Sequence, residues 1–161
     1  MSNSNEAIAY SLRTSQSLLQ RFTDDLTAQE YVHRPMPKAN CAAWLIGHLT
    51  LSDRNTLKRF NVPLPALPEG FEHRFSRDEG CPQANEFGDA KTLVPLFNEH
   101  RQKLIDAILS SAPEQLDKSL EKPHPLFKTL GELANFMAAH TAMHAGQITM
   151  IRRSLGRPPL V

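Results

Sequence analysis

The chain has 161 residues and a formal net charge of +1, with 22% of its residues charged. This near-neutral balance argues against a nucleic acid or an anionic membrane surface as the partner, and no apolar run approaches the roughly 20 residues that span a bilayer. Its two cysteines, Cys41 and Cys81, are too few for a disulfide framework, and the N-terminus lacks a signal-peptide pattern. We therefore expect a single domain over residues 1–161, located in the cytoplasm.

Four stretches carry apolar residues at helical spacing and are predicted to be amphipathic helices. They cover about residues 4–26, 40–60, 89–111 and 129–155. Asn40 is the expected N-cap of the second helix, and Thr129 with Glu132 forms a capping box that starts the last one. Three charged residues of the second helix fall away from its apolar face and are expected in solvent: Asp53, Arg54 and Lys58.

The connections are short except for residues 61–88, which contain four prolines. This stretch is predicted to be a long crossover with little regular structure. Glu30–His33 is expected to be a loop or a short helical turn, Pro113–Lys118 a short helical turn, and no convincing strand pattern is present. These features together predict an all-α fold, namely a four-helix bundle with one long crossover connection.

Histidines interrupt the apolar faces of three predicted helices. His140 and His144 lie one helical turn apart on the last helix, so their imidazoles share one face. His48 lies on the apolar face of the second helix and His100 on that of the third, while Ser15 takes the matching place on the first. Because a buried imidazole needs a polar partner or an ion, these residues are predicted to satisfy one another, water or a metal.

Three neutral imidazoles around one ion leave coordination positions open, which is typical of catalytic sites. We therefore predict a divalent transition metal held by His48, His140 and His144. All-imidazole ligation suits zinc, nickel, iron and copper alike, and of these zinc or nickel is favoured. The alternative interpretation is a hydrogen-bonded core network without metal.

Each ligating imidazole is expected to donate its second N–H to a nearby acceptor. Four residues have the helical phase for this role: Ser15, Ser52, Asn55 and Gln147. Gln147 could instead face the open coordination position. Thr141 follows His140 where a zincin protease carries its catalytic glutamate, so that class is disfavoured. His100 is a candidate proton carrier, a fourth ligand that would close the site, or an ordinary core histidine.

Two motifs resemble those of a known family. The segment Trp44–His48, read Trp-Leu-Ile-Gly-His, and the segment His140–Ile148, read His-Thr-Ala-Met-His-Ala-Gly-Gln-Ile, are similar to the DinB-like (YfiT-like) superfamily of metal-dependent enzymes. The resemblance covers nearly the whole chain. It implies an up-down-down-up bundle, three metal ligands at His48, His140 and His144, and a homodimer.

The resemblance implies several activities, because some members of the family are S-transferases that use a low-molecular-weight thiol and others isomerise with such a thiol. The leading hypothesis is a thiol-dependent S-transferase that acts on a small electrophile at the three-histidine metal site. A metal-dependent hydrolase of a small ester or amide is the second hypothesis, and a non-catalytic metal-binding or stress-related protein is the third. His100 and Gln147 are the candidate catalytic residues, and the expected partner is a small-molecule substrate rather than nucleic acid or membrane.

Overall fold

The computed structural model describes residues 4–76 and 86–160. Cys81 therefore lies outside the described residues. Four long helices make up most of the fold: α1 (Ser4–Thr23), α3 (Ala42–Leu57), α5 (Leu93–Ser110) and α7 (Leu130–Ser154). They confirm the four helices predicted from the apolar spacing.

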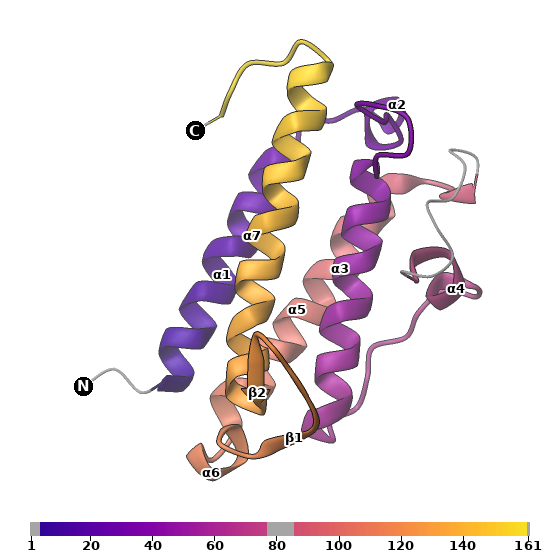
Figure 1. Ribbon diagram of the computed structural model, residues 1–161. Coiled ribbons are helices and arrows are strands. Elements are labelled where there is room, and N and C mark those ends of the chain that lie inside the picture. Colours follow the sequence, from indigo (N-terminus) through magenta and orange to yellow (C-terminus); the bar gives the residue numbers. More distant parts are fainter. Residues whose placement is uncertain (1–3, 77–85, 161) are drawn as a thin grey trace.

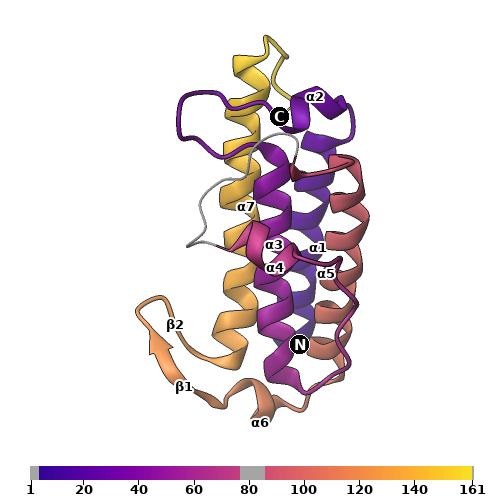
Figure 2. The same ribbon diagram turned by 90° about the vertical axis from the view of Figure 1, so that its right-hand side faces the viewer.

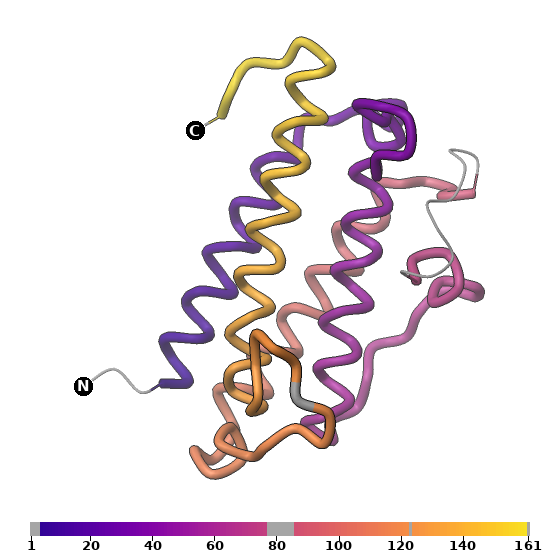
Figure 3. Tube along the Cα trace, viewed as in Figure 1, coloured from indigo at the N-terminus to yellow at the C-terminus, as the bar shows by residue number. Residues whose placement is uncertain are grey.

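The four helices form a bundle in which α1 and α7 run in one direction while α3 and α5 run in the other (Figure 1). The Cα trace in Figure 3 shows the same path without the ribbon. α1 packs beside α7 and α3 beside α5, and contacts of α1 with α5 and of α3 with α7 complete the bundle. The predicted up-down-down-up topology is thus confirmed. No helix in the described part of the chain is both long and apolar enough to cross a membrane.

The ends of the long helices agree only partly with the sequence signals. Thr129 caps α7, because its Oγ1 accepts from the Glu132 backbone N–H while the Glu132 carboxylate accepts from the Thr129 N–H, as the capping box predicts. The prediction for α3 is wrong by one residue. Cys41, not Asn40, is its N-cap, and the Cys41 side chain makes no capping hydrogen bond.

Short elements fill the connections between the long helices. They are α2 (Ala28–Tyr31), η1 (Lys58–Phe60), α4 (Phe71–Phe75), η3 (Ala90–Thr92), α6 (Pro113–Leu116), β1 (Ser119–His124) and β2 (Phe127–Thr129). β1 and β2 pair antiparallel, with His124 opposite Phe127, so the expectation of no strand was wrong. Backbone pairing and the stacking of those two rings at 4.5 Å hold this hairpin. Neither the backbone pairing nor the ring stacking requires apolar and polar residues to alternate, so the sequence shows no strand pattern here.

The long crossover returns along the outer side of α3, where α4 lies against that helix (Figure 2). Phe75 of α4 packs into the space above Gly47 of α3. A Cβ added at Gly47 would lie 2.2 Å from Phe75 Cδ1, so no larger residue fits there without a shift. Phe71 and Phe75 are buried, which anchors this part of the crossover beside His48.

Two apolar clusters, one toward each end of the bundle, make up the core. On each long helix a buried polar residue lies between the residues of one cluster and those of the other. We call these four buried residues the polar layer: Ser15, Asp53, Arg101 and Thr141. One residue comes from each long helix, so the layer crosses the whole bundle.

An ion pair lies at the centre of the polar layer. Arg101 donates from Nε to Asp53 Oδ2 at 2.6 Å and from Nη2 to Asp53 Oδ1 at 2.9 Å. Nη2 also donates to Thr141 Oγ1 at 2.8 Å, and Nη1 to Ser15 Oγ at 3.4 Å. Burial raises the pKa of the Asp53 carboxyl, and the paired guanidinium opposes that rise.

The polar layer corrects two predictions. Asp53 is fully buried rather than in solvent, because α3 is covered by α5 and α7 on more sides than its apolar stripe indicates. Ser15 accepts from Arg101 and does not contact an imidazole through any hydrogen bond found in the described residues. Arg54 is also largely covered, with 17% of its side chain exposed, whereas Lys58 is about half exposed as expected.

Candidate metal centre

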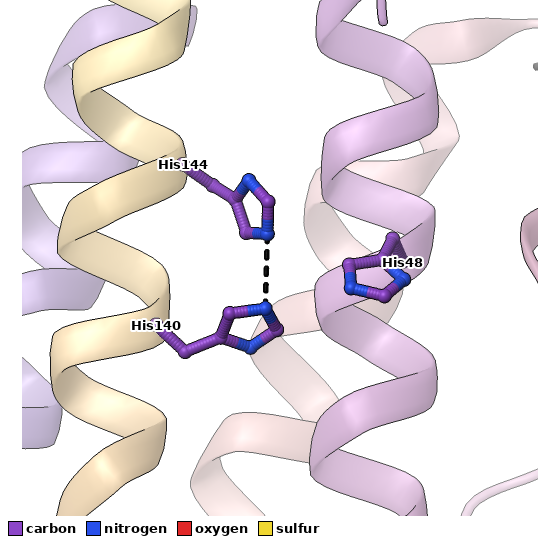
Figure 4. Close-up of side chains that lie close together, drawn as sticks. All are labelled: His48, His140 and His144. Carbon is purple, nitrogen blue, oxygen red and sulfur yellow. Dashed lines mark hydrogen bonds between the residues drawn. The ribbon is translucent and has the colours of Figure 1, made fainter. Parts of the chain in front are cut away.

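Three imidazoles from two helices converge beside the polar layer. Figure 4 shows His140 and His144 projecting from α7 toward His48 on α3. The His48 ring lies 5.2 Å from the His140 ring and 5.4 Å from the His144 ring, centroid to centroid. One ligand nitrogen from each of the three residues can be chosen so that all lie within 4.8 Å of one another. The structure therefore brings together the three residues that the sequence predicts as metal ligands.

The helical spacing of His140 and His144 sets the geometry of the pair. Their Nε2 atoms are 2.9 Å apart, a hydrogen-bond distance that requires one proton between the two nitrogens. Nitrogens around a tetrahedral zinc are about 3.3 Å apart, given Zn–N distances of about 2.0–2.1 Å. Together with a nitrogen of His48, which lies within 4.8 Å of a nitrogen of each, His140 and His144 offer three imidazole donors of the kind that divalent transition metals take, so the donor set fits such an ion.

Aromatic rings one turn earlier on each helix support two of the imidazoles. Trp44 stacks on His48 with the centroids 4.9 Å apart and the planes 5° apart. Phe136 stacks on His140 at 5.9 Å and 12°. The helical phase places Trp44 on the same face as His48 and Phe136 on the same face as His140, but the sequence did not identify either ring as a support. The shared i, i+4 spacing was the signal that could have identified both as supports.

Gln147 supports the third imidazole. Its Oε1 accepts from His144 Nδ1 at 2.8 Å, which fixes the tautomer and leaves the Nε2 lone pair facing the other histidines. The other residues considered for this role have different partners. Ser52 donates to the His48 backbone carbonyl, and Asn55 accepts from Lys58 Nζ at 3.1 Å. Gln147 is thus the one sequence candidate that contacts a site imidazole through a hydrogen bond in the described residues.

His100 lies apart from this cluster. It is completely buried, its Nδ1 lies 2.9 Å from the Leu96 carbonyl oxygen, and it neither joins the three-histidine group nor lines the neighbouring cavity in the described part of the chain. Burial lowers the pKa of His100, so the neutral imidazole is the favoured form. The structure therefore gives His100 the position of a core histidine and does not place it as a fourth ligand.

A cavity of about 390 Å³ opens beside His48, between α3 and α4. Its lining residues are His48, Leu51, Ser52, Asn55, Lys58, Glu72, Phe75 and Ser76. His48 and His140 are half-buried and His144 is 8% exposed, and His48 is the member of the cluster that lines the cavity. The volume lies within the range of small-molecule sites, and the lining combines polar and apolar surface in similar amounts.

Comparison with solved structures places the fold among known bundles. A conserved protein from Enterococcus faecalis matches with a TM-score of 0.75 and 14% identity, covering 98% of this chain and 100% of that one. YfiT from Bacillus subtilis matches with a TM-score of 0.69 and 13% identity, covering 98% and 91%. YfiT is described as "a probable metal-dependent hydrolase with an unusual four-helix bundle topology". At these identities the likeness establishes the fold alone.

Comparison at the level of sequence establishes the family. No curated protein gave a significant match. The sequence family described as the DinB superfamily matches residues 11–148, a range that includes all three histidines of the cluster. Because this match spans most of the chain and the fold agrees with it, the chain belongs to the DinB superfamily.

Proposed function

We propose that the protein is a metal-dependent enzyme, and specifically a thiol-dependent S-transferase that acts on a small electrophile. The observation that carries the proposal is the convergence of His48, His140 and His144 next to an open cavity. Three neutral nitrogen donors suit a divalent transition metal, with zinc or nickel favoured. An ion bound there would lower the pKa of a coordinated thiol or water and stabilise the resulting anion.

The residues around the histidines hold the donor set in place. Trp44 and Phe136 restrict the rings of His48 and His140 by stacking, and Gln147 fixes the tautomer of His144. Locked rings reduce the ordering needed when a ligand binds. These contacts support a preorganised site on two rigid helices.

A thiol transfer suits this site because it needs no protein base. The thiol sulfur forms a bond to the electrophilic carbon, the leaving group departs with its bonding electrons, and the thiol proton passes to solvent. Among the described residues that line the cavity, Glu72 is the one carboxylate, and it lies near Arg54 and Lys58. The polar lining from Ser52, Asn55 and Lys58 favours a polar ligand, and low-molecular-weight thiols are polar molecules.

The test uses protein purified without nickel resin and then loaded with zinc or nickel. Glutathione, bacillithiol and mycothiol are titrated by calorimetry, and conjugate formation with monochlorobimane is followed by fluorescence. We expect one thiol to bind and to give a rate above the uncatalysed reaction that disappears after chelation. Absence of binding by all three thiols, together with a rate equal to buffer, would overturn the S-transferase proposal.

Metal-dependent hydrolysis is the second candidate, and the description of YfiT favours it. It predicts turnover of p-nitrophenyl acetate that needs the metal but no thiol. The same loaded protein therefore separates the two reactions, since addition of thiol raises only the transferase rate. A loaded protein that binds neither thiol nor ester would support the non-catalytic metal-binding alternative instead.

We also propose a cytoplasmic homodimer. The exposed side of α7 carries small and apolar residues at helical spacing: Ala139, Ala142, Met143, Gly146 and Met150. Met143 and Met150 are 56% and 58% exposed, and a second copy would cover them. Light scattering of wild type and Met143→Glu tests the dimer, with a monomeric mass expected for the variant.

The buried free thiol of Cys41 is consistent with a reducing compartment, as proposed for the cytoplasm.

A further inference from the structure

The cavity beside His48 carries surplus positive charge at its far end. Lys58 Nζ lies 3.8 Å from Glu72 Oε1, and Arg54 Nε lies 3.5 Å from the same oxygen. Lys58 and Glu72 line the cavity and Arg54 adjoins it through this contact. Two cations thus share one carboxylate, so a further anion at this point would be stabilised.

The contacts of Glu72 with these cations are loose. Both distances exceed the roughly 2.7–2.9 Å of a charge-assisted hydrogen bond, and 62% of the Glu72 side chain is exposed. Arg54 Nη1 donates to the Pro65 carbonyl oxygen, which holds the guanidinium against the crossover. Arg54 Nε is buried and makes no hydrogen bond with any described residue. The guanidinium therefore keeps one donor for which Glu72 is an imperfect acceptor.

The cavity has the length to connect these cations with the histidines. His48, Ser52 and Asn55 line it along one side of α3, and Lys58, the first residue of η1, lines it just beyond the end of that helix. The rise from His48 to Lys58 is about 15 Å at 1.5 Å per residue. Long side chains on a helix lean toward its N-terminus, which brings the Lys58 ammonium closer to His48. A ligand about as long as a tripeptide could therefore reach both ends.

We propose that Lys58 and Arg54 form a carboxylate-binding subsite for a ligand whose reacting atom lies at the three histidines. This inference rests on the proposed function and deepens it, because it selects thiols or substrates with a carboxylate roughly 10–15 Å from the reacting group. Glu72 stands in for the ligand carboxylate and turns toward solvent when the ligand binds. Asn55 orients the Lys58 ammonium through the hydrogen bond between their side chains.

The first experiment needs neither metal nor turnover. S-methylglutathione, which has two carboxylates and a blocked thiol, is titrated into metal-free protein while backbone amide resonances are followed by NMR. We expect saturable shifts in the segment from Ser52 to Lys58. The dimethyl ester of the same compound, in which both carboxylates are neutral, should give no saturable shift there. Equal binding of acid and ester, or no shift in this segment, would overturn the subsite.

Three variants test which charges are responsible. Lys58→Gln should weaken binding of S-methylglutathione by about three- to fivefold, the range expected for one partly exposed ion pair. Glu72→Gln should strengthen it, because the competing carboxylate is removed. Lys103→Gln, an exposed position on α5, is the matched control and should leave the dissociation constant unchanged. If Lys58→Gln and Lys103→Gln behave alike, Lys58 does not bind the carboxylate and the proposal fails.

Zinc-loaded protein then separates this proposal from the proposed function. If glutathione binds more tightly than 2-mercaptoethanol and Lys58→Gln reduces only the glutathione affinity, both proposals are supported. If the two thiols bind equally, the thiol function stands and the subsite fails. If neither thiol binds while metal-free protein still binds S-methylglutathione, the subsite stands and the thiol function fails.

Discussion

The polar layer and the three-histidine cluster both draw side chains from α3 and α7, and in α7 they adjoin, since Thr141 follows His140. In the polar layer the Arg101 guanidinium has an acceptor on each nitrogen, and all four side chains are excluded from solvent. In the histidine cluster two nitrogens share one proton, and one of the three rings, that of His48, lines an open cavity. A satisfied buried cluster fixes a structure, whereas an accessible cluster of donors can bind a ligand.

The two clusters are linked through the helices they share. Arg101 bonds to Asp53 on α3 and to Thr141 on α7, and thereby sets how far these two helices stand apart at the level of the site. His48 lies on the same helix as Asp53, and His140 precedes Thr141. The distance between His48 and the α7 pair therefore depends on the polar layer. Variants that alter one cluster at a time can separate stability from ligand binding.

The largest effect on stability is expected from Arg101→Met. This change leaves the Asp53 carboxylate buried without its ion pair, which should cost about 3–5 kcal/mol of unfolding free energy. Urea denaturation measures the loss, and Arg13→Met, an exposed position on α1, is the control. The double variant Arg101→Met with Asp53→Leu should recover most of the stability because no charge is then buried. A double variant as unstable as the single one would contradict this account.

His48→Ala should have the opposite profile, with a large loss of metal and little change in the stability of the metal-free protein. Removal of even an outer hydrogen-bond partner lowers metal affinity about 10–100-fold, so loss of a ligand should lower it at least about 100-fold. Metal analysis after dialysis and competition with a chromophoric chelator measure the change. His73→Ala, an exposed histidine on α4, should retain wild-type metal content. Equal metal in both variants would rule out the three-histidine site.

Gln147→Ala should weaken metal binding by about 10–100-fold while leaving all three ligands in place, because His144 loses the acceptor for its Nδ1–H. Its unfolding free energy should stay close to wild type, since Gln147 is exposed. The same chelator competition applies. Gln102→Ala on α5, whose amide bonds to Asp106, is the control. An unchanged affinity would show that Gln147 does not orient the imidazole.

The contrast between the two clusters also explains what the sequence could predict. The histidine site was accessible to sequence reasoning because His140 and His144 are fixed by local helical geometry, and His48 interrupts an apolar stripe. Asp53 was misplaced because helical phase reports only which residues share a face with His48. It does not report how many sides of α3 are covered by other helices. Arg101 was missed for the same reason, since its acceptors come from three different helices.

The hairpin and α4 were missed for a related reason. Nothing in the sequence of residues 119–129 alternates between apolar and polar side chains, and the strands hold together through backbone pairing. α4 has only five residues, and its position depends on Phe75 meeting Gly47 of a distant segment. Local patterns reveal elements long enough to repeat their period, whereas contacts between distant segments appear only in the folded chain.

Gly47→Ala should affect the cavity and leave the polar layer intact. The added methyl group overlaps the buried Phe75 ring, so Phe75 must move and the unfolding free energy should fall by about 1–3 kcal/mol. Gly146→Ala on α7, compared in the monomeric Met143→Glu background, is the matched control, because a Cβ there meets open space in the single chain and should stabilise the helix by up to about 1 kcal/mol. In urea denaturation, Gly47→Ala should lower the unfolding free energy and Gly146→Ala should raise it. A neutral Gly47→Ala would show that α4 is not docked through Phe75.

The smallest effect concerns His100, the buried imidazole that belongs to neither cluster. Burial lowers its pKa below the ordinary 6.5, Arg54 lowers it further, and the Leu96 carbonyl, Asp53 and Glu99 partly oppose the shift. The unfolded chain therefore takes up this proton at higher pH than the folded protein does. Stability should fall as the pH drops below about 6.5, with a slope of at most about 1.4 kcal/mol per pH unit from one group.

His100→Leu should remove the loss of stability that protonation of His100 causes at low pH. On going from pH 7.5 to pH 5.5, the unfolding free energy of wild type should therefore fall by more than that of the variant. Urea denaturation of metal-free protein at both pH values measures it, and the other histidines cancel in the difference because both proteins contain them. His124→Leu, at an exposed position in β1, is the control for removal of an imidazole from the surface. The difference in unfolding free energy between wild type and His100→Leu could instead be the same at both pH values. His100 would then be protonated as easily in the folded protein as in the unfolded chain, and burial would not control its charge.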